Sequence, residues 1–268
     1  MNYVRPKKSL GQHFLTDMGI ASRIADTIDA CKEIPVLEVG PGTGVLTQFL
    51  MQKNRELKVV ELDNESVSYL LEHFNKLAPE NIISADFLKM NLMSVFDGHE
   101  FVLTGNYPYN ISSQIFFKVV DNRTLIPCCT GMVQKEVAER LAAQPGTKSY
   151  GVLSIFIQAW YDVEYLFTVH ENVFNPPPKV KSAVICMTRN SRESLGCDVK
   201  LFRQIVKTVF TMRRKMVRNG LKQVLSGMID KDISAEFLSD SEFNKRPEQM
   251  SIEEFISLTN RISALQHV

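Results

Sequence analysis

The sequence has no apolar run long enough to cross a bilayer and no apolar core near its amino terminus. A membrane-spanning helix needs about 20 mostly apolar residues, and no such run occurs in the 268 residues. The first segment, Met1–Lys8, is basic and polar, which does not fit a secretory signal peptide. These absences predict a cytoplasmic protein without a membrane partner.

Cysteine is scarce, and its spacing excludes two further classes of protein. The five cysteines, at positions 31, 128, 129, 186 and 197, form no C-x-x-C pair. We therefore expect reduced, mostly buried thiols, with neither a disulfide framework nor a zinc site. No metal is predicted.

Internal repeats and low-complexity segments are absent as well, and the net charge is only +1. Hydrophobic residues make up 44% and charged residues 23% of the chain, as in ordinary globular proteins. A chain of 268 residues is long enough for one large domain and a small second one.

The most informative stretch is a glycine-rich turn that follows a short apolar run, Val36–Val39. Glycine occupies positions 40, 42 and 44, and apolar residues at helical spacing follow, from Val45 to Leu50. Glycine allows a tight turn and the close approach of a ligand to the backbone, and a helix N-terminus offers free N–H groups. Strand, turn and helix together predict a nucleotide-cofactor site in an open α/β sheet. A purely structural turn is the alternative.

The details of this turn indicate which cofactor it suits. A dinucleotide fingerprint needs glycine at position 45, where Val45 stands, and the chain instead has E-x-G-x-G-x-G from Glu38 to Gly44. A second apolar run, Lys58–Asp63, ends in carboxylates, and Glu61 there can accept hydrogen bonds from ribose hydroxyls. This combination resembles motif I and its successor in S-adenosylmethionine-dependent methyltransferases.

Two further apolar runs end in polar residues. Asn81–Ser84 is followed by Asp86, which suits the exocyclic amine of an adenine or, alternatively, a helix or turn cap. Phe101–Thr104 leads into Asn106-Tyr107-Pro108-Tyr109-Asn110. An amide carbonyl, a rigid turn and an aromatic face then lie at the carboxyl end of a strand, where ligands bind in such sheets. The alternative is an Asn-capped proline turn.

The chemistry that Asn106–Tyr109 suits is methylation of an exocyclic adenine amine. The lone pair of N6 is delocalised into the ring, so the nitrogen is a poor nucleophile. Carbonyl acceptors aimed at its two N–H groups draw it toward a tetrahedral form. We expect the Asn106 side chain and a backbone carbonyl of the turn to supply these acceptors, while Tyr109 stacks on the base.

Several segments together resemble the rRNA adenine N6-dimethyltransferase family, which includes a small-subunit housekeeping enzyme and the erythromycin-resistance methylases. The matching segments are Lys8–Leu15, Glu38–Gly44, Glu61, Asp86, Asn106–Tyr109, Met132–Leu141 and Phe174–Ser182. Two positions depart from the family pattern: Tyr107 stands where Leu or Ile is usual, and His13 where Asn is commoner.

The resemblance implies a fold and a set of site residues. The fold is the class I (Rossmann-like) α/β methyltransferase with a seven-stranded mixed sheet over residues 1–190, followed by a small all-helical rRNA-docking domain over residues 191–268. The implied catalytic residues are Asn106, Pro108, Tyr109 and Phe174. The implied residues for S-adenosyl-L-methionine are Gln12, His13, Leu15, Gly40, Gly42, Gly44, Glu61, Asp86 and Asn106.

A basic run in the second domain predicts contact with RNA. Between Val199 and Lys222 there are eight basic residues and no acid, and apolar residues recur at helical spacings, so we expect a helical segment with outward charges. Such a run without acids predicts phosphate contact. We assign Arg213, Arg214, Lys215 and Arg218 to RNA binding.

Within the family, Phe210–Leu221 and Pro176–Pro178 resemble the housekeeping branch. The resemblance then implies methylation of N6 of two adjacent adenosines in the 3′-terminal hairpin of 16S rRNA within the 30S subunit, by a monomeric enzyme. A 23S rRNA methylase conferring macrolide resistance and a non-catalytic ribosome-assembly factor are the alternatives.

Overall fold

The computed structural model describes residues 4–266, which form two compact units. One unit comprises the chain up to Glu139 together with Tyr161–Arg189, and the other comprises Arg140–Trp160 together with the residues from Asn190 onward. The division at residue 190 expected from the sequence stays a prediction. No helix within residues 4–266 is long and apolar enough to cross a membrane.

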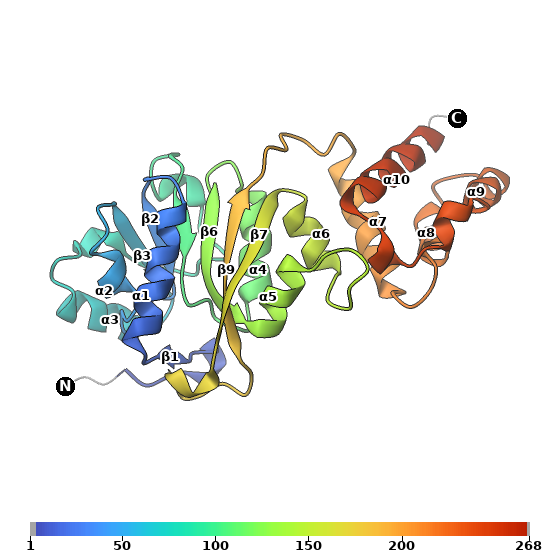
Figure 1. The fold of residues 1–268 in the computed structure, drawn as a ribbon. Helices are drawn as coiled ribbons and strands as arrows, with labels where there is room; N and C mark the ends of the chain where they lie inside the picture. Colours follow the sequence, from blue (N-terminus) through green and yellow to red (C-terminus); the bar gives the residue numbers. More distant parts are fainter. Residues whose placement is uncertain (1–3, 267–268) are drawn as a thin grey trace. The chain divides into compact units, whose positions relative to one another are not determined.

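A seven-stranded mixed sheet organises the first unit (Figure 1), as expected, with the strand order β4-β3-β2-β5-β6-β9-β7. The first five strands in this order are parallel to one another, and β9 is antiparallel to both β6 and β7. The strands are β2 (Val36–Val39), β3 (Leu57–Glu61), β4 (Ile82–Ser84), β5 (Val102–Thr104), β6 (Cys128–Gln134), β7 (Tyr161–Val169) and β9 (Ser182–Arg189). The fold is that of a class I methyltransferase.

The parallel strands β2, β3, β4 and β5 are short, and β3, β4 and β5 end at the polar residues Glu61, Ser84 and Thr104. All four residues of β2 are buried, as expected for a strand covered on both faces of a parallel sheet. The helices of this unit are α1 (Met18–Asp26), α2 (Thr47–Leu50), α3 (Asn64–His73) and α4 (Ser112–Asp121), and α5 (Lys135–Ala142) begins in it. Because β2 lies between β3 and β5, the strand order reverses at its carboxyl end, which is where such sheets bind ligands.

Two helices are shorter than the sequence predicts. The helix expected over residues 17–30 is α-helical only to Asp26 and continues as a 3-10 turn over Thr27–Ala30. After the glycine turn, α2 begins only at Thr47, because Gly40, Gly42 and Gly44 all have positive φ and residues 42–46 form turns.

A second, two-stranded sheet pairs the start of the chain with a distant segment. β1 (Phe14–Leu15) is antiparallel to β8 (Phe174–Asn175), with Phe14 opposite Asn175 and Leu15 opposite Phe174. The Thr16 N–H donates to the Val173 carbonyl over 2.8 Å and extends this pairing.

The expectation that every cysteine is a reduced thiol is wrong for one pair. Cys31 and Cys128 are joined by a disulfide, and Cys186 lies close to both. The end of the 3-10 turn packs on the first residue of β6, which brings the two Cα atoms to 6.1 Å although the residues are 97 positions apart. Sequence spacing carries no signal for such a contact.

The second unit is helical. Its helices are α6 (Val152–Gln158), α7 (Val199–Thr211), α8 (Val217–Leu225), α9 (Lys231–Leu238) and α10 (Ile252–Leu265). Ser251 caps α10 by accepting from the Glu254 N–H, and Glu254 accepts in return from the Ser251 N–H, which is the capping box that the sequence predicts. The basic run is not one continuous helix, because turns over residues 212–216 separate α7 from α8.

Candidate functional site

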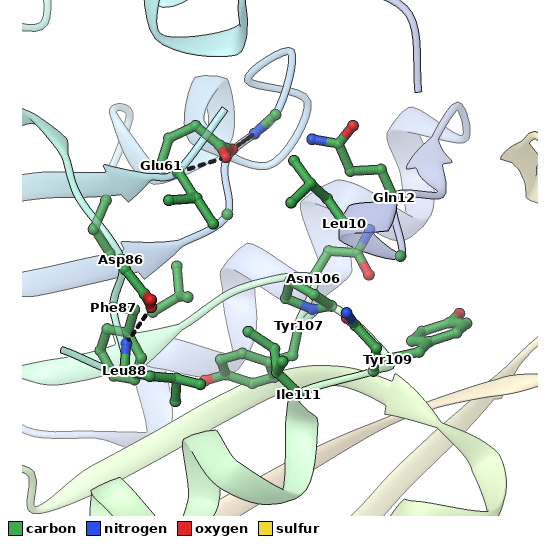
Figure 2. A pocket seen from close by; sticks show the side chains of 18 of the residues that line it. Leu10, Gln12, Glu61, Asp86, Phe87, Leu88, Asn106, Tyr107, Tyr109 and Ile111 are labelled. Carbon is green, nitrogen blue, oxygen red and sulfur yellow. Dashed lines mark hydrogen bonds between the residues drawn. The ribbon is translucent and has the colours of Figure 1, made fainter. Parts of the chain in front are cut away.

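A cavity lies at the carboxyl ends of β2, β3, β4 and β5, where the sequence predicts a site (Figure 2). Most of the predicted residues meet here, although they come from five separate segments. The predicted residues that line it are Gln12, His13, Gly40, Gly42, Glu61, Asp86, Asn106, Pro108 and Tyr109. In Figure 2 the carboxylates of Glu61 and Asp86 lie on one side, and Leu10, Gln12 and Tyr109 lie on the other.

Glu61 is held by backbone N–H groups at the tip of β3. Its Oε1 accepts from Leu62 over 2.8 Å and from Asp63 over 2.9 Å, and its Oε2 accepts from Gly42 over 3.0 Å. An ionised carboxylate has about four acceptor positions, so these three bonds leave one, on Oε2. Burial raises the pKa of Glu61, and the backbone hydrogen bonds oppose that effect.

Gly42 and Gly44 have different roles in the glycine turn. A Cβ at Gly42 would lie 2.8 Å from the Phe14 ring, which lines the same cavity. A Cβ at Gly44 would lie only 2.1 Å from Phe74, and Gly44 does not line the cavity. Gly44 therefore makes room for core packing beneath the turn.

Glu38 stands behind the glycine turn. It is 1% exposed, accepts from the Thr47 hydroxyl over 2.7 Å, and lines a smaller cavity that also includes Leu15, Gly42 and Asn106. Burial raises the pKa of Glu38 to about 8, so this carboxyl group holds a proton at neutral pH.

Asp86 caps a turn, which is one of the two roles that the sequence left open, and it also lines the cavity. Its Oδ1 accepts from the Leu88 N–H over 3.0 Å, as a turn cap does, and Lys89 lies 3.5 Å from Oδ2. The side chain is 28% exposed and lines the cavity, so an oxygen remains accessible to a ligand.

The Asn106 side chain is oriented by the N-terminal segment. Its amide nitrogen donates to the His13 carbonyl over 3.1 Å, so the amide oxygen is the atom left to accept. The following residue, Tyr107, is fully buried and donates its hydroxyl to the Thr130 carbonyl over 2.8 Å. The core thus accommodates the larger side chain at this position.

Tyr109 is directed away from Glu61 and Asp86 (Figure 2). Its ring stacks on His13 with centroids 5.4 Å apart, and its hydroxyl hydrogen-bonds Ser182. The His13 ring donates from Nδ1 to the Pro176 carbonyl over 2.8 Å. Burial raises the pKa of Tyr109 despite the bond with Ser182, which keeps the phenol protonated and unsuited to act as a base.

Phe174 and Leu15 do not line the main cavity. They are paired across β1 and β8, and both are 4% exposed. Their predicted roles toward substrate and cofactor stay predictions.

Sequence reasoning missed several lining residues: Leu10, Phe14, Leu62, Phe87, Leu88, Asn110 and Ile111. Leu62 and Phe87 each directly follow a predicted acid, so their position after the strand end was an available signal. Asp63 was also missed as a buried helix cap that receives Lys7.

The four predicted RNA-binding residues of the second unit differ in their contacts. Arg213 donates to Glu248 over 2.6 Å and to the carbonyls of Thr147 and Lys148, and Arg218 donates to Asn244. Arg214 and Lys215 are exposed in the turn between α7 and α8. The structure therefore places two of the four in internal contacts.

Comparisons with known proteins show the family of the chain. A sequence model of the ribosomal RNA adenine dimethylase family matches residues 4–263. The chain is 66% identical to a ribosomal RNA small subunit methyltransferase A of Phocaeicola vulgatus over 98% of this chain and 92% of that protein. It is 65% identical to the protein of the same name from Bacteroides fragilis, over 98% and 94% of the two chains.

A solved structure, the crystal structure of a dimethyladenosine transferase from Plasmodium falciparum, is similar in fold. The TM-score is 0.78 at 26% identity, over 95% of this chain and 98% of that one.

Proposed function

The chain belongs to the ribosomal RNA adenine dimethylase family, and from this premise we propose that it dimethylates N6 of two adjacent adenosines in the 3′-terminal hairpin of 16S rRNA. S-adenosyl-L-methionine is the proposed methyl donor. The proposal rests on one observation: the residues Asn106–Tyr109 line the same cavity as Glu61 and Asp86, the acids at the ends of two strands.

The residues of the cavity fit S-adenosyl-L-methionine. Glu61 keeps one acceptor position on Oε2 for a ribose hydroxyl, and Asp86 offers an accessible oxygen for the adenine amine. The exposed Leu62 side chain and Phe87 supply apolar surface for the adenine ring between these acids. When bound, this cofactor supplies an electrophilic methyl group on a sulfonium.

Asn106 prepares the amine of the target base. Its amide nitrogen is occupied by the His13 carbonyl, so its oxygen accepts from one N–H of N6. The Pro108 carbonyl already accepts from Ile111 over 3.2 Å, and we assign the Tyr107 carbonyl to the second N–H. Two acceptors held in place before the reaction favour the nucleophilic form of N6 at no reorganisation cost.

Tyr109 provides the stacking surface for the base. Its hydroxyl is held by a hydrogen bond with Ser182, and one face of its ring stacks on His13. Rings 5.4 Å apart leave no room for a base between them, so the adenine stacks on the other face of Tyr109 or displaces His13. Phe174, in β8, is proposed to lie near the target base.

The second unit is proposed to dock the enzyme on the RNA backbone of the 30S subunit, with the enzyme acting as a monomer. The basic run between Val199 and Lys222 contains no acidic residue of its own, although Glu248 pairs with Arg213. Arg214 and Lys215 are exposed for phosphate contact.

Transfer of radiolabelled methyl groups to undermethylated small subunits tests the function. We expect label in N6,N6-dimethyladenosine of 16S rRNA and none in 23S rRNA supplied as control. Label in 23S rRNA would instead support a macrolide-resistance methylase, and binding to small subunits without transfer would indicate an assembly factor.

A further inference from the structure

Residues 10–14 form one wall of the cavity. They belong to an N-terminal segment that is held in place at both of its ends. Its C-terminal end is held by the pairing of β1 with β8 and by the bond from Thr16 to Val173. Between the anchors, Gly11 approaches the catalytic loop closely, since a Cβ there would lie 2.7 Å from Asn110 Oδ1.

The other anchor is an ion pair between Lys7 and Asp63. The Lys7 ammonium hydrogen-bonds Asp63 Oδ1 and lies 3.1 Å from Glu65 Oε1. The Lys7 backbone N–H donates to Gln12 Oε1 over 2.8 Å. Lys7 thus links Gln12, which lines the cavity, to Asp63.

Asp63 is a firm attachment point because other groups already fix it. Its side chain is 2% exposed, accepts from the Glu65 N–H as the cap of α3, and accepts from the Ser66 hydroxyl over 3.2 Å. Its backbone N–H also donates to Glu61. The Lys7 side chain is 36% exposed, so the lysine is the partner that can leave.

We infer that Lys7 and Asp63 are positioning residues whose ion pair holds residues 10–14 against the cofactor cavity and thereby sets how fast the cofactor and its demethylated product leave. This inference rests on the proposed function. Neither Lys7 nor Asp63 lines the cavity, so the pair acts through Leu10–Phe14. Its loss should raise the dissociation rate of the cofactor and its KM while sparing the methyl-transfer step.

Three variants and one matched control test the inference. Lys7→Ala removes the cation, Lys7→Arg restores a cation, and Asp63→Asn removes the charge while keeping a side chain that caps helices well. Lys53 is the control, because it also bridges two acids, Asp26 and Asp29 at 2.7 and 2.6 Å, but does not line the cavity.

In stopped-flow measurements with S-adenosylmethionine and S-adenosylhomocysteine, we expect Lys7→Ala and Asp63→Asn each to increase the dissociation rate about three- to tenfold. A half-exposed ion pair supports an effect of this order. The double variant should release the cofactor no faster than either single variant. Lys7→Arg keeps a cation and should therefore show a dissociation rate close to that of the wild type. Lys53→Ala should match the wild type.

Two further readouts distinguish anchoring from a general loss of structure. The single-turnover rate on small subunits at saturating cofactor should stay within about twofold of the wild type. Hydrogen exchange should quicken at the amides of Gly11 and Gln12, which bond the Lys8 and Lys7 carbonyls, in Lys7→Ala but not in Lys53→Ala.

Dissociation rates equal to wild type in both Lys7→Ala and Asp63→Asn would overturn the inference, as would a single-turnover rate reduced in proportion to the rise in KM. Failure of the wild-type protein to bind S-adenosylmethionine at all would instead overturn the proposed function.

Discussion

Glu38 is a buried carboxyl group in the glycine motif that stays protonated near neutral pH. Its pKa of about 8 lies above the ordinary value of 4.5 because of burial. The folded protein therefore keeps a proton that the unfolded chain releases between these two pH values. Stability contributed by this group is complete below about pH 4.5 and is lost as the pH rises toward 8, by up to about 1.4 kcal/mol per pH unit.

Glu38→Gln should remove this dependence while keeping an acceptor for the Thr47 hydroxyl. Urea unfolding of both proteins from pH 5 to 8 should show the variant gaining stability relative to wild type as the pH rises. Parallel stability curves would mean that Glu38 is ionised throughout.

In the proposed function, the loop Asn106–Tyr109 contains one group that activates the amine, Asn106, and one group that stacks on the base, Tyr109. Asn106→Ala should lower the single-turnover rate far more than it weakens RNA or cofactor binding, because its interaction is strongest in the transition state. Tyr109→Phe keeps the ring and loses only the bond to Ser182, so it should retain most activity.

Tyr109→Ala should lose about ten- to a hundredfold or more, since stacking contributes roughly 1–3 kcal/mol per base. Single-turnover methylation of small subunits compares all three variants. Near-normal turnover in Asn106→Ala would contradict its role, and equal damage from Tyr109→Phe and Tyr109→Ala would assign the leading role to the hydroxyl.

At the scale of elements, α7 and α8 approach each other closely at a glycine. A Cβ on Gly220 would lie 2.6 Å from the Val209 Cα, which is backbone and cannot easily move aside. Gly220→Ala should therefore destabilise the second unit by about 1–3 kcal/mol, although alanine is the better helix former.

Thermal unfolding checks this prediction, with Gly151→Ala as the control. A Cβ at Gly151, in the same unit, would meet nothing within 4 Å. If Gly220→Ala melts no lower than this control, the helices separate enough to admit a methyl group.

Arg213 is predicted to stabilise the turn between α7 and α8, whereas Arg214 and Lys215 in the same turn are predicted to bind RNA. Arg213→Ala should lower the melting temperature, because Arg213 joins Glu248 to the carbonyls of Thr147 and Lys148. Arg214→Ala with Lys215→Ala should instead flatten the salt dependence of RNA binding, by up to about 0.9 log units per log salt for each duplex phosphate that the protein no longer neutralises.

Filter binding over a salt series, with calorimetric melting of the same proteins, separates the two effects. An unchanged salt slope in the Arg214/Lys215 double variant would show that these charges are only solvated.

Across the whole molecule, the sequence predicted features that depend on local pattern. Buried strands such as Val36–Val39 are short apolar runs bounded by glycine or an acid, so their positions in the chain and the cavity at their ends could be predicted. The family resemblance supplied the seven-stranded sheet.

Features that depend on contacts between distant segments could not be predicted in this way. The ion pair of Lys7 with Asp63, the disulfide of Cys31 with Cys128 and the bond of Tyr109 with Ser182 join residues far apart in sequence. The break at residues 212–216 was missed because the apolar spacing continues across it.

The pairing of β1 with β8 also orders events during synthesis. Residues 10–14 are synthesised well before Phe174–Asn175, the strand that holds them. At about 5–20 residues per second this interval is roughly 8–30 s. The part of the cofactor cavity translated earliest is therefore fixed in place late, and the nascent chain has no complete site until most of the catalytic unit has been translated.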